Sequence, residues 1–213
     1  MQNKKPVLIS IILLIAIFVG GALFYQNSQS QKALEQAQAQ AQSLQRAHSL
    51  VVGDKNAKVQ LVEFFDPACG TCAQFHPLVK NYIKENEGKI KLVLRYAPFH
   101  KNSNYAVKML EGAREQGLFM ETLDFMFSTQ RYWIQNHVVN PQLLWRALSK
   151  VEGLDMEKLG VFMNDPKADE LIKLDLADAE KLGANKTPSY FVNGKPLENF
   201  GWENLVKLIE SEL

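Results

Sequence analysis

The stretch from Glu63 to Pro77 reads EFFDPACGTCAQFHP and holds both cysteines of a chain of 213 residues. It begins within AKVQLVEFF, where alternate positions are almost all apolar, as expected of a strand that is covered on both faces. From about Gly70 to Glu85, apolar residues recur at three- and four-residue spacing, which predicts an amphipathic helix. The sequence therefore predicts a buried strand followed directly by a helix whose start carries Cys69 and Cys72.

This placement gives the two thiols different chemistry. Unpaired amides and the helix dipole at a helix N-terminus stabilise a thiolate, so we expect the pKa of Cys69 to fall from about 8.5 into the range of about 3.5 to 7.5. Cys72 lies one turn further along, on the face that carries Phe75 and Val79, so it should be buried and have a higher pKa. Cys69 would attack a disulfide, and Cys72 would resolve the mixed disulfide.

Other uses of a cysteine pair are weighed against this one. A c-type haem site needs histidine directly after the second cysteine, where this chain has Ala73. A structural zinc site needs four ligands, and Cys69, Cys72 and His76 supply three. Those three could hold copper or zinc in a tethered metal-delivery protein, and an adaptor that only holds partner proteins is a third hypothesis. Redox exchange is favoured, because the only two cysteines have redox spacing at a strand-to-helix junction.

The rest of the globular part alternates between strand and helix patterns. KIKLVLRYAPF predicts a second buried strand over Lys89–Tyr96. An insertion at about residues 102–183 follows, with five helical patterns and no strand signal. TPSYFVNGKP then predicts a strand at Ser189–Val192, an Asn-Gly turn and a short return strand, and a last helix is expected over Trp202–Glu212. These elements predict an α/β fold.

Four features follow one another in this chain: FFDPACGTCAQFHP, a helical insertion, AEKLGANKTPSYFVNGKP and a terminal helix. In this order they resemble the DsbA-like branch of the thioredoxin superfamily, the bacterial extracytoplasmic thiol-disulfide oxidoreductases. The resemblance covers about Leu50–Leu213 and implies a thioredoxin fold with an inserted helical domain. It also implies that the Thr187–Pro188 bond is cis and faces the cysteine pair, with the backbone before the proline pairing with a bound substrate strand.

Glu63, six residues before Cys69, matches a buried acid beneath the active site in enzymes that the chain resembles. A carboxyl group in an apolar strand should have a raised pKa, which suits it to carry a proton to or from Cys72. A glutamate at a strand edge that reaches solvent is the alternative.

The dipeptide between the cysteines departs from the DsbA pattern. Gly70 and Thr71 replace the Pro-His pair of the most oxidising members, and Thr71 cannot place an imidazole against the Cys69 thiolate. A less stabilised reduced form implies a less oxidising potential, within a range of about −270 to −120 mV. Threonine before Pro188 also indicates a less oxidising potential, because isomerases and reductases of this superfamily often carry threonine at this position.

The predicted function is disulfide exchange with substrate proteins outside the cytoplasm, as an oxidase, with a disulfide reductase or isomerase as the alternative. A membrane redox partner would recycle the cysteine pair, and no metal or organic cofactor is expected.

The first 50 residues predict a membrane anchor and a stalk. Val7–Phe24 is an uncharged apolar run, long enough as a helix of about 27 Å to cross a bilayer. Residues 1–6 carry two lysines, so the tail should be cytoplasmic and the rest extracytoplasmic, on a single-pass anchor in the bacterial inner membrane. Residues 25–50, rich in Gln and Ala, predict a solvated stalk before a catalytic domain at 51–213.

Charge and the remaining histidines add two expectations. The chain has 24 Lys and Arg against 23 Asp and Glu, a near balance that offers no electrostatic pull on nucleic acid. His100, in PFHKNSN, follows the second predicted strand in a loop that could approach the active site. His48 and His137 are expected to be solvated.

Overall fold

The computed structural model describes residues 24–29, 31–32, 35–36 and 38–213, which belong to two units divided after Gln42. The described residues of the first unit are helical. The predicted membrane span, Val7–Phe24, lies outside the described residues except for its last residue. Within the described ranges, no helix has the length and apolar character needed to span a membrane.

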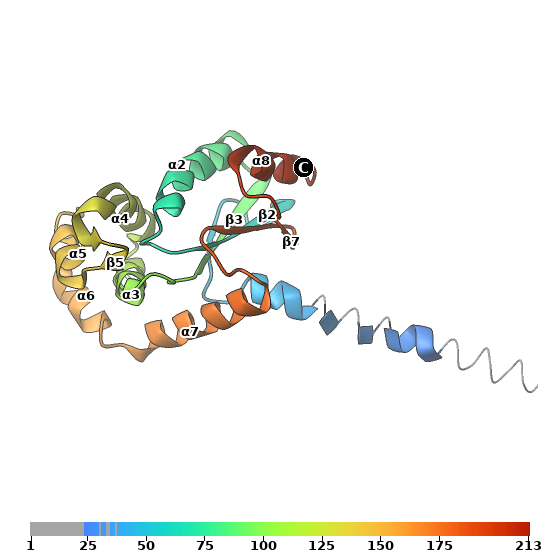
Figure 1. The fold of residues 1–213 in the computed structure, drawn as a ribbon, viewed down its shortest axis with the longest axis horizontal. Coiled ribbons are helices and arrows are strands. Elements are labelled where there is room, and N and C mark those ends of the chain that lie inside the picture. Colours follow the sequence, from blue (N-terminus) through green and yellow to red (C-terminus); the bar gives the residue numbers. More distant parts are fainter. Residues whose placement is uncertain (1–23, 30, 33–34, 37) are drawn as a thin grey trace, which may run out of the picture. The chain divides into compact units, whose positions relative to one another are not determined.

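A five-stranded sheet forms the centre of the second unit (Figure 1). Its order is β1-β3-β2-β6-β7, in which β2 and β3 are parallel and the other neighbours are antiparallel. The predicted strands are confirmed, although β3 begins one residue later than expected. The strands of this sheet are β1 (Leu50–Val52), β2 (Val59–Phe65), β3 (Ile90–Tyr96), β6 (Ser189–Val192) and β7 (Lys195–Pro196).

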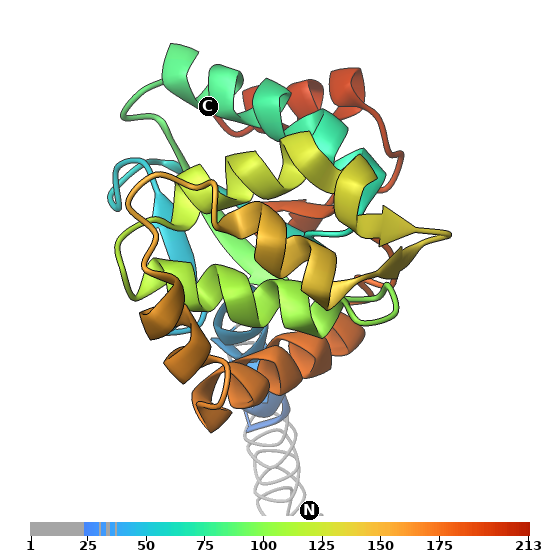
Figure 2. The ribbon, with the colours of Figure 1, turned by 90° about the vertical axis from the view of Figure 1, so that its left-hand side faces the viewer.

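Helices cover both faces of the sheet, with α2 and α8 on one face and α7 on the other (Figure 1). The five helices predicted in the insertion are all present, and in Figure 2 α3, α4 and α5 lie in front of the sheet. The last helix ends two residues before the predicted end. The helices are α2 (Gly70–Glu85), α3 (Ser103–Arg114), α4 (Phe119–Trp133), α5 (Pro141–Leu148), α6 (Met156–Phe162), α7 (Pro166–Lys181) and α8 (Trp202–Glu210).

Alternate residues of β2 point into two separate cores. Leu61 and Phe65 join the core under α2 and α8, whereas Val62 and Phe64 join the core on the face of α7. This alternation is why both sets of residues in the strand are apolar. Glu63 shares its face with Leu61 and Phe65, so its carboxyl group points toward the core on the side of α2.

Two short pairings were not predicted. The insertion contains a hairpin of β4 (Ile134–Gln135) and β5 (Val138–Val139), although its sequence shows no strand signal. Its two turn residues, Asn136 and His137, both have positive φ, the conformation of a tight type I′ turn. The usual glycine is absent there, which hid the turn. β1 was also missed: its three residues lie across the boundary between the predicted stalk, which ends at residue 50, and the predicted catalytic domain.

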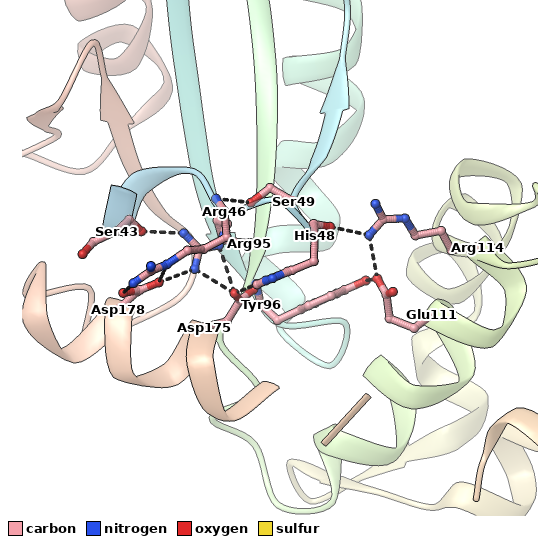
Figure 3. A network of polar contacts seen from close by, with 10 residues as sticks. All are labelled: Ser43, Arg46, His48, Ser49, Arg95, Tyr96, Glu111, Arg114, Asp175 and Asp178. Atoms are coloured by element: carbon pink, nitrogen blue, oxygen red, sulfur yellow. Dashed lines mark hydrogen bonds and ion pairs between the residues drawn. The ribbon is translucent and has the colours of Figure 1, made fainter. Parts of the chain in front are cut away.

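The folded unit begins at Ser43, several residues before the predicted start of the catalytic domain. The Arg95 guanidinium of β3 is fully buried and donates hydrogen bonds to the Ser43 carbonyl, to Asp175 and to Asp178 (Figure 3). Arg46 adds two bonds to Asp178, at 2.8 and 2.6 Å. This network joins the segment before β1 to β3 and α7.

The expectation that His48 is solvated is wrong. Its Nε2 lies 2.5 Å from Asp175 Oδ1, and its carbonyl accepts a hydrogen bond from Arg114 (Figure 3). Arg114 also pairs with Glu111, which accepts a hydrogen bond from the Tyr96 hydroxyl. The partners of His48 come from α7 and α3, far along the chain, so the sequence near His48 could not reveal them.

We expect Arg95→Met to destabilise the protein by about 3 to 5 kcal/mol, because it leaves Asp175 and Asp178 in the core with less positive charge beside them. Urea unfolding at neutral pH measures this loss. As a control, Lys167→Ala breaks the exposed pair with Glu115 and should change stability by less than about 1 kcal/mol. Equal, small effects of the two variants would contradict the importance of the buried network.

Candidate active site

Cys69 is the N-cap residue of α2, directly after the loop that leaves β2. Its sulfur accepts a hydrogen bond from the Cys72 amide at 3.3 Å. Both cysteines carry free thiols and are buried, Cys69 with 5% and Cys72 with 0% of its surface exposed. The structure therefore confirms the predicted placement of the pair at the start of a helix that follows a buried strand.

The two thiols have opposite electrostatic surroundings. A hydrogen bond from the Cys72 thiol, with further help from the amides of Cys72 and Thr71, outweighs burial and lowers the pKa of Cys69 from 9.0 to about 6. Burial, the bond to Cys69 and the charge of Glu63 raise the pKa of Cys72 well above 9.0. At neutral pH the arrangement thus favours a thiolate on Cys69 and a protonated thiol on Cys72.

Gly70 and Thr71 form the first turn of α2 between the two cysteines. A Cβ atom at Gly70 would meet nothing within 4 Å, so the space above this residue is open. Thr71 contributes its backbone amide to the sulfur of Cys69. Within this dipeptide it is therefore the backbone that acts on the attacking sulfur, and no side chain contributes a charge.

Glu63 is buried, with 2% of its surface exposed, because β2 lies in the interior of the sheet and helices pack on the face to which Glu63 points. The Tyr190 hydroxyl donates a hydrogen bond to Glu63 Oε1 at 3.2 Å. Burial raises the pKa of Glu63 from 4.5 to about 8, against the opposing effect of the Tyr190 bond. The alternative of a solvated, strand-edge glutamate is therefore wrong.

The Thr187–Pro188 peptide bond is cis, as the resemblance implied. It lies directly before β6, the strand next to β2. When Cys69 is protonated, its thiol donates a hydrogen bond to the Thr187 carbonyl, with sulfur and oxygen 3.2 Å apart. The main chain before the proline is thus in contact with the attacking sulfur.

A buried carboxylate next to the pair was missed by the sequence analysis. Asp66 is fully buried, and its side chain accepts hydrogen bonds from the Ala68 amide, the Ser103 hydroxyl and both the amide and Nδ1 of His100. Its backbone carbonyl accepts from the Cys69 amide at 2.9 Å. The Asp-Pro step before the cysteines signals a turn in the sequence, but it does not reveal these partners.

Gln130 of α4 was also missed. Its side-chain amide donates to the carbonyls of Pro67 and Cys69, at 2.9 and 3.0 Å. The inserted helices therefore hold the loop that carries the attacking cysteine. Nothing in the sequence of a helix distinguishes a glutamine with such a role from a solvated one.

His76 lies apart from the redox chemistry. It is buried on α2, with its Nε2 2.6 Å from Asp124 Oδ1 and its ring against Phe127. Burial lowers the pKa of His76 below 6.5. In the described part of the chain, no three His, Cys, Asp or Glu side chains are grouped so that they could hold a metal ion. The proposed ligand set of Cys69, Cys72 and His76 therefore does not form.

This chain is similar to known proteins of the thioredoxin type. A family model described as Thioredoxin matches residues 45–211. The probable disulfide bond formation protein D of Bacillus anthracis is 28% identical over 222 residues, covering 100% of this chain and 98% of that protein. The Na(+)/H(+) antiporter NhaA of Herminiimonas arsenicoxydans is 30% identical over 145 residues, 68% of this chain. The chain spans only 22% of that antiporter's length.

A solved structure shows the same fold. Wolbachia pipientis alpha-DsbA1 superposes with a TM-score of 0.70 at 19% identity, covering 81% of this chain and 94% of that chain. Fold and site together define a thiol-disulfide oxidoreductase of the DsbA-like type, with its cysteine pair at Cys69 and Cys72. The chain belongs to the thioredoxin family.

Proposed function

We propose that this protein exchanges disulfides with substrate proteins outside the cytoplasm and acts mainly as an oxidase of their thiols. The observation that supports this best is the pKa of about 6 for Cys69, beside a Cys72 thiol whose pKa is raised. A thiolate that is stable at neutral pH is a good leaving group, so a disulfide that contains Cys69 passes readily to a substrate.

In the oxidising direction, a substrate thiolate attacks the Cys69 sulfur of the oxidised pair. The bond between Cys69 and Cys72 breaks, a mixed disulfide forms, and the electron pair stays on Cys72. A second substrate thiolate then attacks the substrate sulfur of the mixed disulfide and releases the Cys69 thiolate. The substrate loses two electrons and gains a disulfide, and the enzyme becomes the dithiol.

Glu63 is proposed to supply the proton that Cys72 takes up. A carboxyl group with a pKa of about 8 is mostly protonated at neutral pH, and its charge interacts with both cysteines. A buried acid can therefore give its proton to the newly formed Cys72 thiolate and recover one later. In the reverse reaction, the same group would accept the proton.

Thr187 and Pro188 are proposed to orient the substrate. The Thr187 carbonyl already contacts the Cys69 sulfur, so a substrate strand that pairs with this backbone would bring its own sulfur to Cys69. Gly70 and Thr71 are proposed to tune the potential, since they leave the Cys69 thiolate without a neighbouring cationic side chain in the dipeptide.

The electrons taken from substrates must pass to a redox partner. Each oxidised substrate leaves the dithiol form, so a membrane redox partner must remove two electrons to restore the disulfide. We propose that the segment Val7–Phe24 anchors the protein in the membrane beside such a partner.

The reduction potential of the Cys69–Cys72 pair tests whether the protein oxidises or reduces its substrates. Equilibration with glutathione should give a value between about −120 and −230 mV, less oxidising than the strongest oxidases. A value near −270 mV would overturn the oxidase proposal in favour of a reductase. Oxidation of a reduced, unfolded substrate by the purified protein is the matching activity assay.

A further inference from the structure

Asp66 places a buried carboxylate directly beneath the loop that carries Cys69. Four hydrogen-bond donors face this carboxylate, two of them on His100. Among these donors in the described structure, the His100 imidazole alone can carry a positive charge. Its Nδ1 lies 2.8 Å from Asp66 Oδ2.

His100 comes from the loop between β3 and α3, and its side chain is 25% exposed. The ring of His137, from the turn between β4 and β5, stacks on it with centroids 6.3 Å apart. The hairpin is held there by the bond from the Val139 amide to the Lys101 carbonyl. The His100 ring thus pairs with Asp66 and stacks on His137, and its charge interacts with that of Cys69.

The charges of His100 and Cys69 interact. The hydrogen bond to Asp66 raises the pKa of His100 above 6.5 against the effect of burial, and the charges of Asp66 and Cys69 add to the rise. Because an interaction between two charges is reciprocal, the imidazolium must favour the Cys69 thiolate to the same extent.

We propose that His100 is a positioning residue for the redox pair: its imidazolium, held by Asp66, neutralises the buried carboxylate under Cys69 and so stabilises the reduced form. This inference rests on the proposed function and deepens it. The dipeptide between the cysteines carries no cation, and His100 supplies one from a loop 31 positions beyond Cys69 in the chain. Without it, the charge of Asp66 would oppose ionisation of Cys69.

The first test uses the unaltered protein. Nuclear magnetic resonance can follow the titration of the His100 ring in the dithiol and disulfide forms. Oxidation removes the thiolate, so the midpoint for His100 should fall by about half a pH unit to one unit, a threefold to tenfold coupling. Identical titrations of His100 in the two forms would overturn the proposal.

Two variants test the effect of the His100 charge on the cysteine pair. His100→Asn keeps a donor in the place of Nδ1 but removes the charge, and His100→Lys restores a charge. We expect His100→Asn to shift the glutathione equilibrium threefold to tenfold toward the disulfide, about 15 to 30 mV more reducing. The midpoint of Cys69 alkylation against pH should rise in parallel. His100→Lys should return both values to within twofold of the parent.

His137→Asn is the matched control. It removes the stacked ring but leaves the pair of His100 and Asp66 intact, and asparagine tolerates the positive φ of this position. It should change the equilibrium by less than twofold. An effect of His137→Asn as large as that of His100→Asn, or equal effects of the asparagine and lysine variants at His100, would show that packing rather than charge is responsible.

The failure of this inference can be told from the failure of the proposed function. If His100→Asn leaves the potential unchanged while the parent still oxidises a reduced substrate, only the role of His100 is wrong. If the parent does not transfer its disulfide at all, the proposed function itself is wrong.

Discussion

Cys69→Ser is expected to reduce catalysed disulfide transfer to the background rate, because the sulfur whose pKa is lowered to about 6 is the one that attacks and leaves. Cys72→Ala should retain the attack but lose the resolving step. When the reduced variant is given a substrate that contains a disulfide, Cys69 should attack that bond and release one substrate cysteine as a thiolate, so a mixed disulfide between Cys69 and the other substrate cysteine should accumulate. Mass spectrometry of the quenched reaction distinguishes the two variants.

Cys72→Ala also tests why Cys69 is ionised. The hydrogen bond from the Cys72 thiol is the largest cause of the lowered pKa, and the backbone amides of the first helical turn contribute less. The pKa of Cys69 should therefore rise above 6 in this variant and stay below 9.0, as measured by the rate of alkylation against pH. A Cys69→Ser variant with full activity would instead support an adaptor that only holds partner proteins.

Glu63→Gln is expected to remove a large pH dependence of stability. In the parent, the pKa of Glu63 is about 8 when folded and 4.5 when exposed, so between these values the unfolded state binds fewer protons than the folded state. The contribution of Glu63 to stability must then fall as the pH rises from about 4.5 to about 8, and stay at the lower level above it. The total loss is about 3 to 6 kcal/mol, from about 1.4 kcal/mol per pH unit.

Urea unfolding of the disulfide form at several pH values measures this effect, because Cys69 does not titrate there. In the dithiol form the lowered pKa of Cys69 would raise stability between about pH 6 and 9 and mask the loss. Glutamine has no proton to lose, so Glu63→Gln should show a flatter profile and exceed the parent in stability near pH 8. Glu87→Gln, at an exposed position, is the control and should keep the profile of the parent. A parent whose stability does not decline over this range would show that Glu63 ionises without cost and is a poor store for a proton.

Local patterns in the sequence were sufficient for most of the fold and for the position of the redox pair. A cysteine that follows a buried strand and precedes an amphipathic helix must lie near the helix N-terminus, because both elements are set by the spacing of apolar residues within a few turns. The helices of the insertion, β2, β6 and the Asn-Gly turn before β7 were predicted for the same reason.

Tertiary structure alone decided the groups that surround the pair. Burial of Glu63 depends on the helices that cover its face of the sheet, with β2 in the interior of that sheet. The partners of Asp66 and Cys69 come from α3, α4 and the loop after β3. Arg46 and His48, predicted to lie in a stalk, are held by carboxylates of α7 more than 120 positions away. Such contacts join residues distant in the chain, so their chemistry is set by how helices and strands pack and leaves no periodic signal in the sequence.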